Sequence, residues 1–280
     1  MHRIPASGLA AATALTLLVG GTTGTVLAET AAQIAAKGGC PGCNLKLAGL
    51  RGLAAKGGDF SDANLIEADL KGAVLDGARF GDASLHRVEM ERASIREADF
   101  SGATMRDGDL EKADGSGARF VETDLRDADM ANANLSGADL TEADLRKALM
   151  RRITAPGAVF REALLERTDL ERADLTGTDF SEARMTGADL DRADLSGAVF
   201  TGATLKSARL SSTDLSGATF DDADLTSALM RRTRLSGADL SGADGLTQKQ
   251  LDLACGDAAT KLPAGLTVKT CSADLQPDTD

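Results

Sequence analysis

Residues 133–150 read ANLSGADLTEADLRKALM and contain the pattern that governs most of the chain. A large apolar residue stands at every fifth position, and a small residue, usually alanine, stands two positions before it. The pattern extends from Phe60 to Leu240, with Gly115 and Ala155 as the only exceptions at the fifth positions. A period of five fits neither an α-helix nor the two-residue alternation of a flat strand. Internal repetition outranks local signals, so the sequence predicts a repeat architecture.

From Asp59 the units read Ala-Asp-Leu followed by two variable residues, or close variants of it; Ala-Asp-Leu itself stands at residues 68–70, 138–140 and 193–195. This motif resembles the A(D/N)LXX unit of the pentapeptide-repeat family, over most of the chain. The resemblance implies an all-β solenoid, a right-handed quadrilateral β-helix with one unit per side and four units per coil. Residues 45–244 would then form about ten four-sided coils, closed by short helical caps at both ends.

The phenylalanines support a coil of four units independently. Successive phenylalanines are separated by twenty residues or a multiple of twenty, so they recur on one side of each coil. Coils about 4.8 Å apart would let successive rings stack inside the core. The eight residues are Phe60, Phe80, Phe100, Phe120, Phe160, Phe180, Phe200 and Phe220.

Glycines recur on the corner just before the phenylalanine side, from Gly77 to Gly237, with Glu97 as the exception. Glycine at the third position of a four-residue turn permits the positive φ of a type II turn. The sequence therefore predicts that this corner is built mainly from type II turns. The other three corners carry mixed residues and need not share that turn.

The first 28 residues are predicted to be a secretory signal peptide. A basic start at Met1–Arg3 precedes an apolar stretch, and Val26, Leu27 and Ala28 suit cleavage before Glu29. An apolar N-terminal helix is the alternative. We therefore expect a periplasmic or secreted protein that does not insert into a membrane after cleavage.

An N-terminal cap is expected over residues 29–44, ahead of the repeats. Residues 30–37 (TAAQIAAK) predict about two turns of helix, stopped by Gly38 and Gly39. The five-residue pattern is loose from Leu47 to Gly58, which predicts an irregular first coil.

A C-terminal cap is expected over residues 245–275. Residues 247–250 (TQKQ) have the form of a capping box and predict a short helix to Cys255, ended by Gly256. Caps of this kind cover the unpaired strand edges of a solenoid. Residues 276–280 are predicted to be a disordered tail.

Four cysteines in an exported chain favour disulfides. Cys255 and Cys271 would close a loop of about 17 residues, a gain of about 3 kcal/mol on the chain-entropy model; free thiols are the alternative in the cytosol. Cys40 and Cys43 form a CPGC motif, for which a structural or disulfide role is favoured over active redox chemistry. Zinc would need four ligands, and the other two cysteines lie far along the rod.

The composition argues against several functions. The net charge is −12 at pH 7, which disfavours direct nucleic-acid binding. Tryptophan and tyrosine, which stack on bases and sugars, are absent. Only two histidines occur, so the chain has few residues for acid–base or nucleophilic catalysis. We expect no enzymatic activity, no cofactor and no bound metal.

Charged residues predict two edges at diagonally opposite corners of the coil. Functional interaction edges are one interpretation, and merely solvated charges are the favoured one. The acidic edge consists of Asp62, Asp82, Glu122, Glu142, Glu162, Glu182 and Asp222, and the basic edge of Arg92, Lys112, Arg152, Arg172, Arg192 and Arg232.

The sequence ALMRR occurs twice, at residues 148–152 and 228–232. Leu149, Val159 and Leu164 occupy slots that usually hold an outward Asp. A weak contact patch is one interpretation; local repacking, beside the exchanged sizes of Ile153 and Ala155, is favoured.

The leading functional hypothesis is an exported, non-enzymatic scaffold that binds another protein. The alternative comes from the family resemblance: some members resemble B-DNA in size and charge and bind DNA gyrase, which protects it from quinolones. The basic edge and the signal peptide both argue against this alternative. An end-to-end homodimer is a further prediction.

Overall fold

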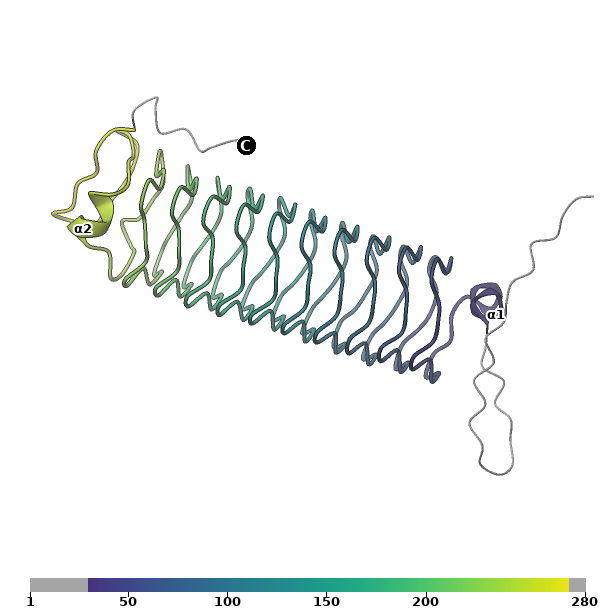
Figure 1. The fold of residues 1–280 in the computed structure, drawn as a ribbon. Helices are drawn as coiled ribbons and strands as arrows, with labels where there is room; N and C mark the ends of the chain where they lie inside the picture. Colours follow the sequence, from purple (N-terminus) through teal and green to yellow (C-terminus); the bar gives the residue numbers. More distant parts are fainter. Residues whose placement is uncertain (1–29, 272–280) are drawn as a thin grey trace, which may run out of the picture.

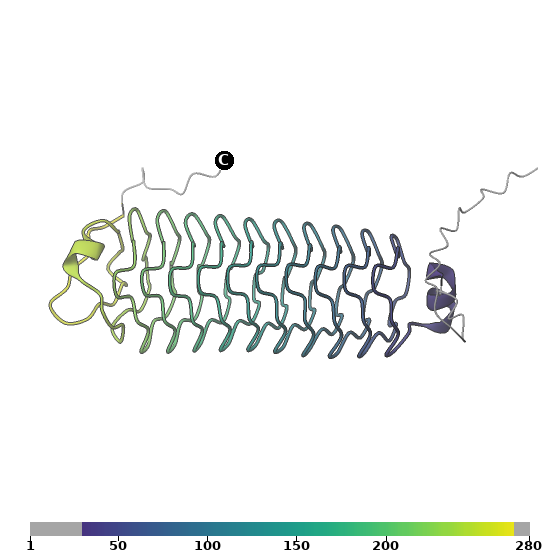
Figure 2. The same cartoon turned by 60° about the horizontal axis from the view of Figure 1, so that its bottom comes forward.

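The computed structural model describes residues 30–271. The predicted signal peptide, residues 272–275 of the predicted C-terminal cap and the predicted C-terminal tail lie outside the described residues. The chain forms a stack of coils along one axis, with α1 (Ala31–Lys37) at one end and α2 (Gln248–Leu251) at the other (Figures 1 and 2). Neither helix has the length and apolar character needed to cross a bilayer within residues 30–271.

Parallel bridges connect each coil to the next with an unbroken register. Every bridge from Gly39–Asp59 to Asp224–Asp244 joins residues twenty apart. This confirms that four five-residue units make one coil and that no insertion interrupts the repeats. Each side contributes a single bridging residue between two turns, which is why the ladder consists of isolated bridges rather than long strands.

Hydrogen bonds explain why the repeat prefers Asp or Asn at its second position. In residues 65–69, four of the five backbone N–H groups donate to backbone carbonyls of the same or a neighbouring coil. The fifth, that of Ile66, donates to the side-chain Oδ1 of Asn64 at 3.2 Å. The same contact recurs along the rod, for example from Ala131 to Asp129 at 3.0 Å. The outward Asp or Asn thus satisfies the one donor that the ladder leaves over.

The positive φ predicted for the glycine corner is confirmed, but it is not confined to that corner, because all four corners share the same backbone. The third residue of every four-residue turn, from Gly42 to Gly237, has a φ between 53° and 71°, whether or not it is glycine. In the turn at residues 60–63, Asp62 donates to the carbonyl of Gly81 at 2.9 Å, and Ala63 closes the turn onto Phe60 at 3.1 Å. These hydrogen bonds hold residues other than glycine in the left-handed region despite its local cost.

The core is filled along the whole axis. The large residue and the small residue of each unit both point inward and are buried. The phenylalanine rings stack in two columns, Phe60–Phe120 and Phe160–Phe220, with centroids 4.7 to 5.3 Å apart. Leu140 separates the two columns. The stacking predicted from the sequence is confirmed.

The first coil is regular, contrary to the prediction for residues 47–58. Bridges join Gly49 to Asp69 and Ala54 to Val74 in the common register. Leu53 and Ala55 exchange the usual small and large sizes, and both are buried. The backbone ladder therefore tolerates a loose sequence wherever the interior volume is still filled.

The N-terminal helix is confirmed. Thr30 and Gln33 form a capping box at its start, and Gly38 ends α1 with a φ of 72°. Ile34, on the inner face of the helix, is fully buried. A short helix thus covers the first edge of the stack.

The C-terminal helix is shorter than predicted. The capping box of Thr247 and Gln250 is present, but α2 ends at Leu251 instead of Cys255. The chain then rejoins the ladder, since Cys255 pairs with Arg234 and Lys261 pairs with Asp239. Pairing with the last coil competes with continuation of the helix, and it extends the stack beyond the end of the five-residue pattern.

Candidate interaction surface

The corners of the coil display the predicted charges in rows. Residues at equivalent corners lie one coil apart, about 4.8 Å along the axis. The twenty-residue register places the acidic edge and the basic edge at diagonally opposite corners. All seven carboxylates of the acidic edge are exposed, and none forms an ion pair within residues 30–271. This edge therefore carries uncompensated negative charge.

The basic edge is partly neutralised by its own neighbours. Arg92 lies 3.1 Å from Glu91, Lys112 lies 2.5 Å from Glu111, and Arg192 lies 3.4 Å from Glu171. Arg172 also approaches Glu171, at 3.9 Å. Arg152 and Arg232 form no ion pair with any described residue. The two edges thus differ in how much charge they offer to a partner.

A second basic edge was missed in the sequence. Arg106, Arg126 and Arg146 succeed one another on the corner before the outward slot of Leu149. Arg126 pairs with Asp124 at 2.5 Å, and Arg146 pairs with Asp144 at 2.6 Å. Burial opposes ionisation of Asp124, but hydrogen bonds from Arg126 outweigh it and lower the pKa of that carboxyl. The twenty-residue spacing of these arginines could have revealed the edge.

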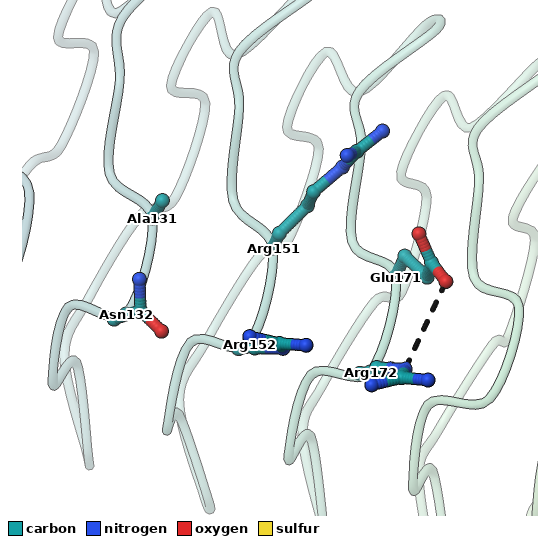
Figure 3. Close-up of a pocket in the computed structure, with 6 residues that line it drawn as sticks. All are labelled: Ala131, Asn132, Arg151, Arg152, Glu171 and Arg172. Carbon is teal, nitrogen blue, oxygen red and sulfur yellow. Dashed lines mark ion pairs between the residues drawn. The ribbon is translucent and has the colours of Figure 1, made fainter.

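One surface hollow of about 420 Å³ lies on the basic edge (Figure 3). It spans three successive coils, where Ala131 and Asn132 have shorter side chains than their neighbours. Arg152 and Arg172 extend alongside each other, whereas Arg151 points away from them. The lining residues are Ala131, Asn132, Arg151, Arg152, Glu171 and Arg172.

The side between the two basic edges carries mainly carboxylates, broken by two exposed leucines. Leu149 is 46% exposed and Leu229 is 55% exposed. We call this side the Leu149 face. Its outward residues are Asp69, Glu89, Asp109, Asp129, Leu149, Asp169, Asp189, Arg209 and Leu229.

The cysteines lie at opposite ends of the rod. Cys40 is joined to Cys43 in the first coil, and Cys255 is joined to Cys271 in the C-terminal cap. Between residues 30 and 271, no cluster of His, Cys, Asp or Glu has the arrangement of a metal site. Guanidinium groups such as those of the basic edge bind carboxylates and other oxyanions through paired hydrogen bonds.

A family model for pentapeptide repeats matches eight copies between residues 43 and 244. The chain belongs to the pentapeptide-repeat family. The matched segments of this pentapeptide-repeat protein are residues 43–82, 73–111, 93–130, 113–152, 157–192, 179–217 and 208–244. The right-handed quadrilateral β-helix is the fold of this family. A comparison with curated proteins found no match.

Solved structures of pentapeptide-repeat proteins resemble the chain. HetL of the cyanobacterium Nostoc sp. strain PCC 7120, involved in heterocyst differentiation regulation, is 30% identical, with 78% of this chain and 90% of HetL covered and a TM-score of 0.32. A trypsin-treated variant of QnrB1, a plasmid-mediated fluoroquinolone resistance protein, is 20% identical, with 68% and 87% covered and a TM-score of 0.44. The family assignment rests on the repeat match over residues 43–244.

Proposed function

We propose that this pentapeptide-repeat protein is an exported, non-enzymatic scaffold that binds another protein along the exterior of its rod. Proteins of this family are in general structural or interaction proteins without enzymatic activity. The observation that carries the proposal is the contrast between a filled interior and a charged exterior. The inner columns are buried side chains, so recognition falls to the edges and faces.

The charged edges supply the recognition chemistry. Carboxylates without internal partners on one edge, and Arg152 and Arg232 on the opposite edge, can pair with a partner without first breaking an ion pair of the rod. Complementary charge of this kind mainly raises the association rate and selects the partner. The bound state is therefore expected to weaken as the salt concentration rises.

Affinity capture with the mature protein tests the binding function. A tagged protein is incubated with a periplasmic fraction at low and at physiological salt, beside a variant in which Glu122, Glu142, Arg152 and Arg192 are replaced by serine. A specific protein that the native rod retains and the variant releases is the expected result. Equal retention by both would contradict recognition through the edges.

Export is the second part of the proposal. The signal-peptide pattern of residues 1–28 supports it, and so does the pairing of all four cysteines, since disulfides persist in oxidising compartments. Cell fractionation with N-terminal sequencing should find a mature chain that begins at Glu29 outside the cytoplasm. Cytoplasmic recovery with Met1 retained would contradict export.

Binding to DNA gyrase is the alternative function. The unpaired acidic edge favours it, because a row of carboxylates can stand in for a phosphate backbone. The two basic edges oppose it, since a duplex mimic needs negative charge on most sides. A gyrase supercoiling assay with excess protein should show no inhibition or protection.

Sedimentation of the mature protein tests the predicted end-to-end homodimer.

A further inference from the structure

The side of the coil at residues 146–152 differs from its neighbours in charge. Its outward residues are Arg146, Lys147, Leu149, Arg151 and Arg152, with no carboxylate among them. The equivalent side one coil earlier includes two aspartates, and the one that follows includes two glutamates and an aspartate. We call residues 146–152 the basic rung.

Two cations of the basic rung are uncommitted. Arg146 pairs with Asp144 at 2.6 Å, and Arg151 pairs with Asp169 at 2.5 Å. The side chains of Lys147 and Arg152 form neither an ion pair nor a hydrogen bond within the described part of the chain. These two residues occupy the corners on either side of Leu149. An exposed apolar side chain is thus bracketed by two free positive charges.

Leu149 lacks the hydrogen bond to the backbone that the equivalent residues of the adjacent coils form. Asp129 and Asp169, in the equivalent slots of the adjacent coils, accept hydrogen bonds from the backbone N–H groups two residues later, at 3.0 and 3.2 Å. Leu149 has no acceptor, so the N–H of Arg151 finds none within residues 30–271. Leu149 also places an apolar side chain in water, and nothing inside the rod compensates for either loss.

The surface hollow adjoins the basic rung at Arg152. Asn132 and Arg172 flank Arg152 on the neighbouring coils, and the short side chain of Ala131 leaves room beside them (Figure 3). Glu171 also lines the hollow but is paired with Arg172 and Arg192, so Arg152, with the amide of Asn132 beside it, is the cation that can pair with an incoming carboxylate. The hollow begins two to three residues along the chain from Leu149, on the adjoining corner of the same coil.

We propose that the basic rung and this hollow bind an extended acidic segment of the partner protein with the pattern acid–x–apolar–x–acid. The inference rests on the proposed protein-binding function and names its site. In an extended segment, residues two apart point to the same side, so both acids and the apolar residue face the rod together. The apolar side chain covers Leu149, one carboxylate meets Lys147, and the other enters the hollow beside Arg152.

The second ALMRR sequence provides a matched comparison within the same molecule. Leu229 is exposed on the same face, and Arg231 and Arg232 follow it on the basic edge. Its other corner carries Thr226 and Ser227, which are uncharged. This site can hold only one of the two acids, so the segment binds at the basic rung in preference.

Fluorescence anisotropy with the full mature protein tests the site. The probe is a fluorescein-labelled peptide, Ser-Glu-Ser-Leu-Ser-Glu-Ser, with a second peptide in which the Leu is replaced by Ser. The variant Leu149→Asn restores the hydrogen-bond acceptor without adding charge, as Asn134 does for Ser136. It should weaken binding of the Leu peptide about tenfold, as should Arg152→Ser. Leu229→Asn should change binding less than twofold.

Several results would overturn the site. Equal binding by native protein and Leu149→Asn, equal binding of both peptides, or no binding at millimolar peptide would each do so. Vesicles of phosphatidylglycerol that bind native protein but not Leu149→Asn would make the rung a membrane site. Self-association abolished by Leu149→Asn would make a second copy the occupant.

Failure of the site is distinguishable from failure of the proposed function. If the double variant Leu149→Asn/Arg152→Ser retains the same periplasmic partner as the native rod, the binding function stands and this site is wrong. If the native rod retains no partner at all, the proposed function itself fails.

Discussion

The side-chain Oδ1 of Asp169 accepts a hydrogen bond from the backbone N–H of Glu171 at 3.2 Å, and Leu149 occupies the equivalent slot one coil earlier. Replacement of Leu149 by Asp should therefore raise the free energy of unfolding by about 0.5–1.5 kcal/mol, because it restores the hydrogen bond and removes an exposed apolar side chain. Chemical denaturation of the mature protein measures the change.

The reverse substitution, Asp169→Leu, is the control. It should lower the free energy of unfolding by a similar amount, because it removes the hydrogen bond to Glu171 and the ion pair with Arg151. Stabilisation by Asp169→Leu, or destabilisation by Leu149→Asp, would contradict the role given to the outward aspartates.

Truncation of the phenylalanine column should be costly. Phe180 stacks on Phe160 at 4.9 Å and on Phe200 at 5.3 Å. Phe180→Ala should lower the free energy of unfolding by about 3–5 kcal/mol, because the stacked coils above and below limit collapse into the cavity. Phe180→Leu, which introduces the residue that position 140 carries at the equivalent place in the coil, should cost less than half as much. A loss below 1 kcal/mol for Phe180→Ala would contradict the rigid column.

Acid should weaken the rod. A hydrogen bond from Arg79, supported by Ser61, lowers the pKa of Asp59 to about 2, and one from Lys261, supported by Ser241, does the same for Asp239. These pKa values lie below the unfolded value of about 3.9, so the folded state holds fewer protons. The associated stability is complete above about pH 4 and is lost as the pH falls towards 2.

The thermal midpoint between pH 5 and pH 2 measures this loss. Asp239→Asn keeps a side-chain acceptor for Ser241 but removes the titrating carboxylate, so its midpoint should fall less steeply. An unchanged midpoint of the native protein between pH 4 and pH 2 would contradict the assignment.

The disulfide of the C-terminal cap should act locally. Cys271→Ser should lower cap stability by about 3 kcal/mol on the chain-entropy model. Hydrogen exchange should then speed up at residues 253–261, where the cap pairs with the last coil, and stay unchanged near Phe100. Mass spectrometry of the unreduced mature protein should find two disulfides, and four free thiols would overturn the pairing.

The sequence predicted the coil because its determinants are periodic. Large apolar residues repeat every five residues, which is the length of one side of the coil. The phenylalanines repeat every twenty residues or a multiple of twenty, and twenty residues make one full coil. The shared turn was missed because residue identity at the corners suggested that only glycine adopts a positive φ. The ladder's hydrogen bonds impose that φ on Asp62 and Arg152 as well.

The end of α2 and the pairing of the charged side chains could not be predicted from the sequence in the same way. Leu253 and Cys255 resume pairing with the last coil, a tertiary contact that no local pattern encodes. The sequence placed the acidic and basic edges by register, but which cations remain free depends on where neighbouring carboxylates reach. Arg92 pairs with Glu91, which precedes it, and Arg192 pairs with Glu171 of the neighbouring coil, whereas Arg152 follows Arg151 and forms no ion pair within residues 30–271.

Site-specific photo-cross-linking in intact cells tests the central claim most directly. A photoreactive phenylalanine analogue replaces Leu149 in one variant and Thr219, an outward residue of the opposite face, in another. We expect an adduct from position 149 but not from position 219, joined to an acidic segment of an exported protein that contains an apolar residue. No adduct from position 149, or equal adducts from both positions, would contradict it.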